Sequence, residues 1–193
     1  MNYLWLVLLW ILYFILHSVL ALFAVKNYFY SLGINAQLYR LIYVIFATIT
    51  LFVIIVFSTI IETRYIFTPD KAWKFGGLIL AGWGFVIAKA GFKNYDTKAF
   101  LGLGSLKPED EFKTDGLLKK MRHPVYTGSI LLVIGYFLFD PKLTTLISVS
   151  MVILYFIIGI HFEEQKLIKT FGSKYIDYKK KTPMLIPRFW KKS

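Results

Sequence analysis

Residues 116–128 read G-L-L-K-K-M-R-H-P-V-Y-T-G, and residues 161–178 read H-F-E-E-Q-K-L-I-K-T-F-G-S-K-Y-I-D-Y. Between them lie two apolar stretches, 125–139 and 143–162, which are separated by only three residues, D-P-K. So short a connection predicts a tight antiparallel helix hairpin. Polar and ionisable residues stand where the apolar stretches end, which is where a membrane protein would build a site for a charged ligand.

The composition is that of a membrane protein. Of the 193 residues, 57% are hydrophobic, whereas a soluble domain has about 45–50%. The chain has no cysteine, so disulfides, thiolate nucleophiles and cysteine-bound metals are excluded. Its three histidines (His17, His123 and His161) leave little for a metal centre, and no metal is expected. Because His17 falls inside an apolar segment, it implies either a packed polar partner or a cavity.

Five apolar segments predict an all-α, polytopic membrane protein with about five transmembrane helices. They cover residues 3–25, 41–61, 75–92, 125–139 and 143–162. A bilayer core needs about 20 helical residues, so the fourth segment is short for a span. The first is expected to be retained rather than cleaved as a signal peptide, because its start carries no positive charge and its apolar run is long. Residues 1–193 are expected to form a single membrane domain, with three spans in 1–92 and the loop, hairpin and C-terminal helix in 93–193.

Positive charge is concentrated in a few connections. The 23 Lys and Arg residues outnumber the 11 Asp and Glu residues, which gives a net charge of +12. Most of them fall in 26–40, 93–122 and 166–192. Since cytoplasmic loops carry an excess of Lys and Arg, this predicts an N-terminus outside and a C-terminus in the cytoplasm. Membrane orientation accounts for the basic charge, so no nucleic-acid binding is expected.

Arg122-His123-Pro124 marks the start of the fourth span. Proline fits the first turn of a helix, where its missing N–H costs nothing. The helix would then begin at Pro124, and a helix N-terminus flanked by Arg and His is suited to an anion. The alternative is an arginine that reaches lipid phosphate beside a histidine satisfied by packing.

Glu163 and Glu164 stand at the inner end of the fifth span. Adjacent residues on a helix point about 100° apart, so the two carboxylates cannot serve one ligand equally. Carboxylates beside hydrocarbon are costly unless paired. One is expected to meet a ligand ammonium group and the other Lys or Arg; the alternative is a solvated helix end.

Residues 167, 168, 171, 175 and 178 are apolar or aromatic and recur at helical spacing. They predict an amphipathic, lysine-rich cytoplasmic helix that Gly172 bends or interrupts. Tyr175 and Tyr178 share a face and could cover an aromatic ring, or could anchor the helix at the membrane surface. An anion site, a cation site and an aromatic wall together match S-adenosylmethionine, which carries a carboxylate, an ammonium group and an adenine.

The order R-H-P-x-Y-x-G, apolar hairpin, E-E-x-x-L-x-x-x-F-G-x-x-Y-x-x-Y and P-x-x-x-P closely resembles the isoprenylcysteine carboxyl methyltransferase superfamily. These are multi-span membrane enzymes that use S-adenosylmethionine. The upstream part is more similar to the branch that contains methanethiol S-methyltransferases and NnrU-like proteins, on His17-Ser18, Tyr39-Arg40, Tyr43 and the segment 94–103. The resemblance spans most of the chain and is most specific over 116–187.

This resemblance implies a site by position. It places the cofactor on Gly116, Leu117, Arg122, His123, Pro124, Tyr126, Gly128, Glu163, Glu164, Tyr175 and Tyr178, with His123 and nearby backbone at the methionine carboxylate and Glu164 at the ammonium. One departure bears on the substrate. The eukaryotic carboxyl methyltransferases have an arginine where Gly159 falls here, which argues against a prenylcysteine carboxylate as acceptor.

The expected function is therefore S-adenosylmethionine-dependent methyl transfer to a small thiol or a lipophilic acceptor. Its partners would be that cofactor, the acceptor and membrane lipids. A thiol must lose a proton near neutral pH, and histidine is suited to that step, so His161 and Glu164 are the candidate catalytic residues. A simple interfacial hydrogen bond is the alternative role for His161. The alternative function is a non-enzymatic NnrU-like membrane transport or accessory protein.

Overall fold

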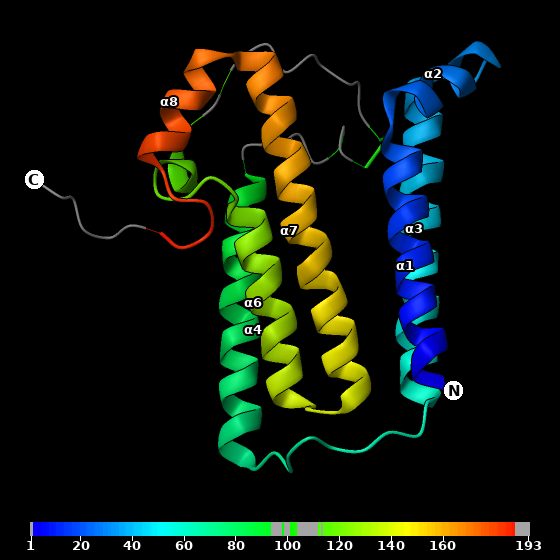
Figure 1. Ribbon diagram of the computed structural model, residues 1–193, viewed down its shortest axis with the longest axis vertical. Helices are drawn as coiled ribbons and strands as arrows, with labels where there is room; N and C mark the ends of the chain where they lie inside the picture. Colours follow the sequence, from blue (N-terminus) through cyan, green and yellow to red (C-terminus); the bar gives the residue numbers. More distant parts are fainter. Residues whose placement is uncertain (1, 94–97, 99–100, 104–111, 113, 188–193) are drawn as a thin grey trace, which may run out of the picture. The chain divides into compact units, whose positions relative to one another are not determined.

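The computed structural model describes residues 2–93, 98, 101–103, 112 and 114–187 (Figure 1). Every regular element in this part of the chain is helical, which confirms the predicted all-α fold. The helices are α1 (Asn2–Ala21), α2 (Phe23–Ser31), α3 (Ala36–Ile60), α4 (Lys71–Phe92), the 3-10 helix η1 (Gly116–Lys119), α6 (Pro124–Phe139), α7 (Leu143–Phe171) and α8 (Ser173–Lys181). Helices α1, α3, α4 and α7 are long and apolar enough to cross a membrane, and α6 is a shorter apolar helix.

The helix ends differ from the predicted segments where local chemistry intervenes. The first segment does not continue to residue 25, because α1 ends at Ala21 and Leu22 is extended. The hydroxyl of Tyr39 donates to the Leu20 carbonyl at 2.8 Å, which satisfies a group that the break releases. Helices α3 and α4 start earlier than predicted, since Asn35 and Asp70 cap their first turns.

Helix α7 runs well past the predicted end of the fifth span. It continues to Phe171, and Gly172, with φ +58°, redirects the chain into α8. This positive φ is favourable only for glycine, which explains why the bend occurs there. The carboxylates at 163 and 164 therefore stand inside a continuous helix rather than at its end.

The structure divides into two compact units. The first contains the described residues of 1–66, 95–108 and 142–151, and the second contains those of 67–94, 109–141 and 152–193. Within the first unit, the Trp10 indole N–H donates to the Ser148 hydroxyl at 3.0 Å. Of the two alternatives predicted for His17, the structure shows a packed polar partner: the ring nitrogens lie 2.9 and 3.1 Å from the Tyr43 hydroxyl.

In the second unit, α4 and α6 pack backbone against backbone through glycines (Figure 1). A Cβ on Gly77 would lie 2.6 Å from the Gly135 carbonyl oxygen, and one on Gly84 would lie 2.5 Å from the Gly128 carbonyl oxygen. Small residues allow this close approach, which is a common way for membrane helices to associate. The contact fixes α6, the shortest of the apolar helices, against a longer neighbour.

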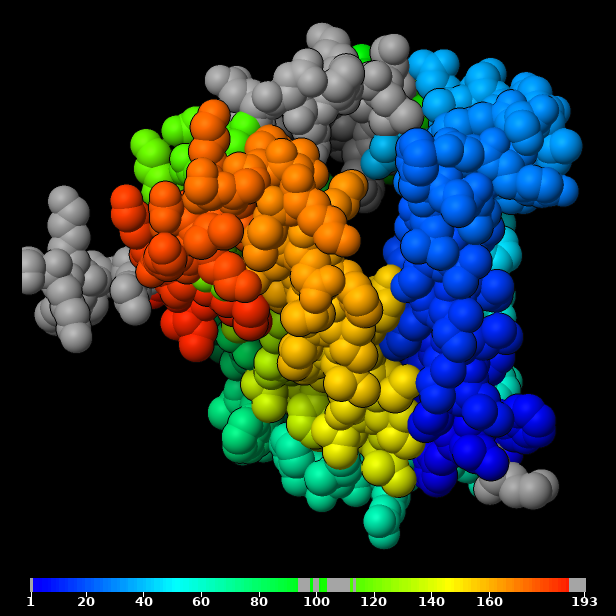
Figure 2. Space-filling view, turned by 45° about the horizontal axis from the view of Figure 1, so that its top comes forward, coloured from blue at the N-terminus to red at the C-terminus, as the bar shows by residue number. Residues whose placement is uncertain are grey.

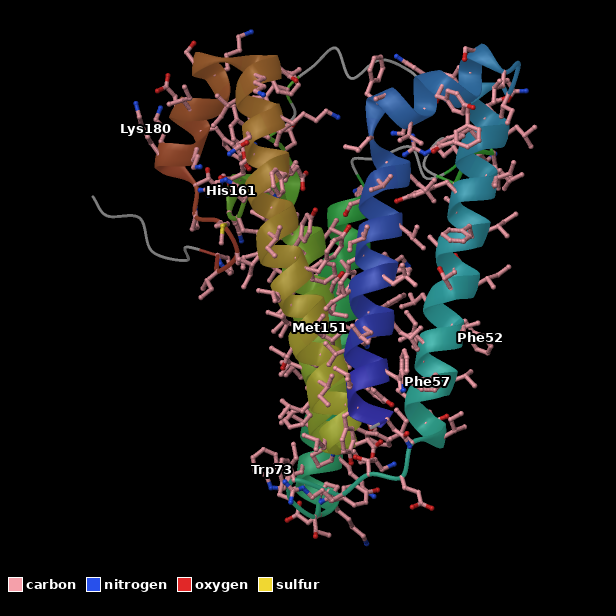
Figure 3. All side chains as sticks on the ribbon, turned by 45° about the vertical axis from the view of Figure 1, so that its right-hand side comes forward. Phe52, Phe57, Trp73, Met151, His161 and Lys180 are labelled. Atoms are coloured by element: carbon pink, nitrogen blue, oxygen red, sulfur yellow. The ribbon has the colours of Figure 1, made fainter. Side chains whose placement is uncertain are left out.

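Large apolar side chains face outward along the long helices. Phe52 on α3 is 65% exposed and points away from the helix pair it belongs to (Figure 3), and Phe75 and Trp83 on α4 are similarly exposed. A soluble protein rarely exposes so much contiguous apolar surface. Together with the lengths of the helices, this indicates a multi-pass membrane protein.

Candidate functional site

The site begins at the N-terminus of α6, which starts at Pro124 as predicted, with His123 at the N-cap. The chain before it is held by a C-terminal strap, residues 182–185. The backbone N–H of Arg122 donates to the Pro183 carbonyl at 2.9 Å, and that of His123 donates to the Met184 carbonyl at 3.1 Å. The strap thus fixes the Arg-His pair through backbone contacts.

A second contact extends the strap along α6. The Thr127 hydroxyl donates to the Leu185 carbonyl at 2.9 Å. The T-P-M-L-I-P segment therefore has a structural role that the sequence prediction did not include. Its contacts use carbonyl groups, which prolines retain although they lack an N–H.

Glu164 is the centre of a buried ion cluster. Its Oε1 atom accepts from Arg122 Nε at 2.7 Å and lies 3.1 Å from His123 Nε2, and its Oε2 atom pairs with Lys179 Nζ at 2.6 Å. The side chains of Glu164 and Arg122 are only 7% and 9% exposed. Buried charges are stable only when paired and hydrogen-bonded, and here the two residues before α6, together with α7 and α8, supply that pairing.

Arg122 also holds the end of α8. Its Nη1 group donates to the carbonyls of Lys179 (3.1 Å) and Thr182. A cation at a helix C-terminus meets the last carbonyls, where the helix dipole is negative. The Arg122 guanidinium thus joins Glu164 to the C-terminal end of α8.

Glu163 has a different environment from its neighbour. Its Oε2 atom lies 3.9 Å from His123 Nδ1, too far for a hydrogen bond, and its side chain is 34% exposed. The imidazole of His123 is thus flanked by both carboxylates. Because the carboxylate of Glu164 only accepts, the 3.1 Å contact requires the proton on Nε2.

The aromatic wall is formed by residues from α7, α8 and the segment before η1. The Phe112 ring lies 5.1, 5.7 and 5.2 Å from the rings of Phe171, Tyr175 and Tyr178. The Tyr178 hydroxyl donates to the Leu118 carbonyl at 2.6 Å, which joins α8 to η1. Figure 2 shows α8 and the strap (orange to red) beside η1 (green) at the end of α7.

Tyr175 is the most deeply buried of these residues. It is 1% exposed, and its hydroxyl has no hydrogen-bond partner among the residues that the structure describes. Burial, together with the charge of Glu164, raises the pKa of the Tyr175 phenol, so the group stays protonated and can donate. Because the Tyr175 side chain is buried within the protein, it does not fit the alternative of a membrane-surface anchor.

The remaining predicted residues lie at varying distance from the ion cluster. The Tyr126 ring packs edge-on against His123, with centroids 5.6 Å apart. Gly116, at φ +61°, and Leu117 begin η1. Gly128 belongs to the α4–α6 contact instead, where its neighbours are Gly84 and Ala88.

His161 is exposed on α7, toward the α8 end of the helix (Figure 3). Its Nε2 atom lies 2.8 Å from Gln165 Nε2, and its ring packs against Phe162. Within the described part of the chain, no hydrogen bond or ion pair joins His161 to Glu164. Conversely, Lys179 and Phe112 contact the predicted site residues, although neither was predicted from the sequence. Lys179 follows Tyr175 by four residues and so lies on the same side of α8. This spacing is the feature of the sequence that could have predicted it.

Comparison with known proteins identifies the family. Residues 73–174, more than half of the chain, match the family model described as "Phospholipid methyltransferase". Methanethiol S-methyltransferase 1 from Bradyrhizobium diazoefficiens is 30% identical over 96% of this chain and 66% of its own length. The methanethiol S-methyltransferase from Pseudomonas deceptionensis is 29% identical over 94% of this chain and 71% of its own length.

A third relative, the methanethiol S-methyltransferase from Crocosphaera subtropica, is 36% identical over 43% of this chain and 32% of its own length. The chain therefore spans from about a third to about 70% of these curated relatives. No solved structure gives a significant match to this chain. The predicted resemblance to membrane methyltransferases is confirmed, and the chain belongs to the phospholipid methyltransferase family.

Proposed function

We propose that this protein is an S-adenosylmethionine-dependent integral-membrane methyltransferase. The observation that carries the proposal is the buried Glu164 cluster beside the orphaned hydroxyl of Tyr175. A buried hydroxyl without a hydrogen-bond partner costs free energy, and a polar ligand that accepts a hydrogen bond from it would remove that cost. The family match and the names of the relatives support the same activity.

The residues present fit the three chemical parts of the cofactor. Glu163 and Glu164 offer carboxylates to the ammonium group, and Phe112, Tyr175 and Tyr178 offer rings to the adenine. Arg122 uses its Nε and Nη1 groups within the protein, at Glu164 and at the end of α8. The cofactor carboxylate would be held beside His123 by the N–H groups of the first turn of α6, which have no acceptor inside the helix.

When bound, the cofactor supplies an electrophilic methyl group on a sulfonium. The protein's part is to align donor and acceptor for in-line displacement and to exclude water. The ion cluster serves alignment, because it ties the start of α6 to α7 and α8. The aromatic wall serves exclusion, since Tyr175 and Phe112 close the space next to the cluster.

For the acceptor we propose a small thiol. The relatives that match most of the chain are named for methanethiol, and Gly159 leaves no cationic group for an acceptor carboxylate on α7 beside Tyr126. The contact between His161 and Gln165 supports a hydrogen-bonding role for His161 rather than that of a base. We further propose that the N-terminus is outside and that α8 and the strap are cytoplasmic, as the distribution of Lys and Arg indicates.

A transfer assay tests the proposal. The purified protein is incubated with S-adenosylmethionine labelled in its methyl group and, separately, with a small alkane thiol, a prenylcysteine or phosphatidylethanolamine. The expected result is label in the thioether, at a rate that falls strongly in Glu164→Gln. Label in the lipid amine would replace the thiol as acceptor. Cofactor binding without transfer to any of the three would refute the enzymatic proposal and favour an accessory membrane protein.

A further inference from the structure

The two oxygens of Glu164 are held by cations of very different mobility. Oε1 meets Arg122 and His123, whose side chains are 9% and 3% exposed. Oε2 meets Lys179, whose side chain is 44% exposed. The inner oxygen is thus fixed by buried, multiply bonded groups, whereas the outer oxygen is held by a lysine whose stem reaches solvent.

Lys179 can leave this position at small cost. Arg122 cannot leave without breaking its bonds to the carbonyls at the end of α8. The lysine ammonium group has one described ion pair, and a solvated ammonium on a flexible stem loses little by swinging outward. The cluster therefore contains one exchangeable cation.

We propose that Lys179 is a place-holding cation that the α-ammonium group of the cofactor replaces at Glu164 Oε2. This rests on the proposed function, in which S-adenosylmethionine binds at this cluster. The two groups are chemically equivalent, since each is an ammonium with three N–H donors and one positive charge. The exchange keeps Glu164 paired at every stage, and an unpaired buried carboxylate is avoided.

The consequence is competition between Lys179 and the cofactor. Cofactor binding must displace an existing ion pair, so its affinity is lower than the carboxylate alone would give. The effect is confined to ligands that carry the ammonium group. A nucleoside that has the adenine and the sulfur but lacks the amino-acid portion would bind without displacing Lys179.

Binding titrations on Lys179→Met test this directly. Methionine keeps the length of the stem and removes the charge. The ligands are S-adenosylhomocysteine and 5′-methylthioadenosine, which lacks the ammonium and carboxylate groups. We expect the affinity for S-adenosylhomocysteine to rise roughly fivefold, the scale of a partly exposed ion pair, and the affinity for 5′-methylthioadenosine to stay unchanged.

Lys180→Met is the matched control, because Lys180 lies next in sequence, is 71% exposed and points away from the protein (Figure 3). It removes the same charge without touching Glu164, so neither affinity should change. A rise in that variant equal to the one in Lys179→Met would show a general charge effect and overturn the proposal. Equal or weaker binding of S-adenosylhomocysteine by Lys179→Met would also overturn it, as would a parallel change for both ligands.

Lys179→Arg keeps the proposal testable if the methionine variant does not fold. Arginine keeps the positive charge beside Oε2, and its planar, pre-organised guanidinium is harder to displace than a lysine ammonium. This variant should therefore bind S-adenosylhomocysteine more weakly than the wild type and 5′-methylthioadenosine equally well. Unchanged binding of both would contradict the place-holding role. If the wild type binds neither ligand, the proposed function itself fails, which is a distinct outcome.

Discussion

Helix α6 is held by two contacts of opposite kinds, one along its length and one at its N-terminus. Along its length, α6 packs against α4 through glycines, with backbone atoms in contact and no charge involved. At its N-terminus, it is held by a buried cluster of ionised groups and by a strap of backbone hydrogen bonds. The first contact depends on the absence of side chains, and the second depends on particular side chains being present. The helix is therefore positioned by shape and oriented at the site by charge.

The largest effect should come from filling the glycine contact. In Gly84→Val, the new Cβ would lie 2.5 Å from the Gly128 carbonyl oxygen, so α4 and α6 must separate. We expect the free energy of unfolding to fall by more than about 3 kcal/mol and little folded protein to remain. Size-exclusion profiles and thermal unfolding in detergent would measure it. The control is Gly82→Val on the same helix, where a Cβ meets nothing within 4 Å and a normal profile is expected.

Next in size is the removal of the charge at the centre of the cluster. Glu164→Gln leaves the buried Arg122 without its counter-ion, which should cost about 3 kcal/mol. Glu163→Gln is the matched neighbour. Its carboxylate is partly exposed and 3.9 Å from His123, so its loss should cost less than about 1 kcal/mol. Equal losses in thermal stability would contradict the structure, in which Glu164 is a buried, paired carboxylate and Glu163 is partly exposed.

Replacing Tyr175 distinguishes an effect on ligand binding from an effect on the stability of the fold. Tyr175→Phe removes a hydroxyl that has no described partner, so the free energy of unfolding should change by less than about 1 kcal/mol, toward greater stability. If the hydroxyl donates to the cofactor, the affinity for S-adenosylhomocysteine should fall about tenfold. Calorimetric titration and thermal unfolding measure the two quantities. Unaltered affinity would remove Tyr175 from the binding site.

The smallest effect is expected at His161. Its side chain is exposed and its polar contact is with Gln165, one turn along the same helix. His161→Ala should change stability by less than about 0.5 kcal/mol and leave methyl transfer within about twofold of the wild type. A large fall in kcat at unchanged KM for the thiol would restore His161 as a catalytic residue.

The features that follow local rules were predictable from the sequence. Apolar runs gave the spans, Pro124 the start of α6, and Gly172 the bend after α7. Features that depend on distant partners were not. The end of α1 at Ala21 interrupts an apolar run, and the carbonyl it frees is satisfied by Tyr39 from another helix.

Within the site, too, local features could be predicted from the sequence and contacts with distant partners could not. The pairing of a glutamate with cations was foreseen from the cost of a carboxylate beside hydrocarbon, but many lysines in the C-terminal region could have supplied a cation. Only the fold selects Lys179 among them. The strap bonds through backbone carbonyls, and these leave no pattern in the side chains.

The most direct test of the central claim is thermal unfolding of the detergent-purified protein with and without S-adenosylhomocysteine. A ligand at 100 times its dissociation constant should add about 2.7 kcal/mol to the free energy of unfolding. We predict a clear rise in Tm for the wild type and a rise reduced or abolished in Glu164→Gln. The same Tm with and without millimolar ligand in the wild type would contradict the assignment of this cluster as a cofactor site.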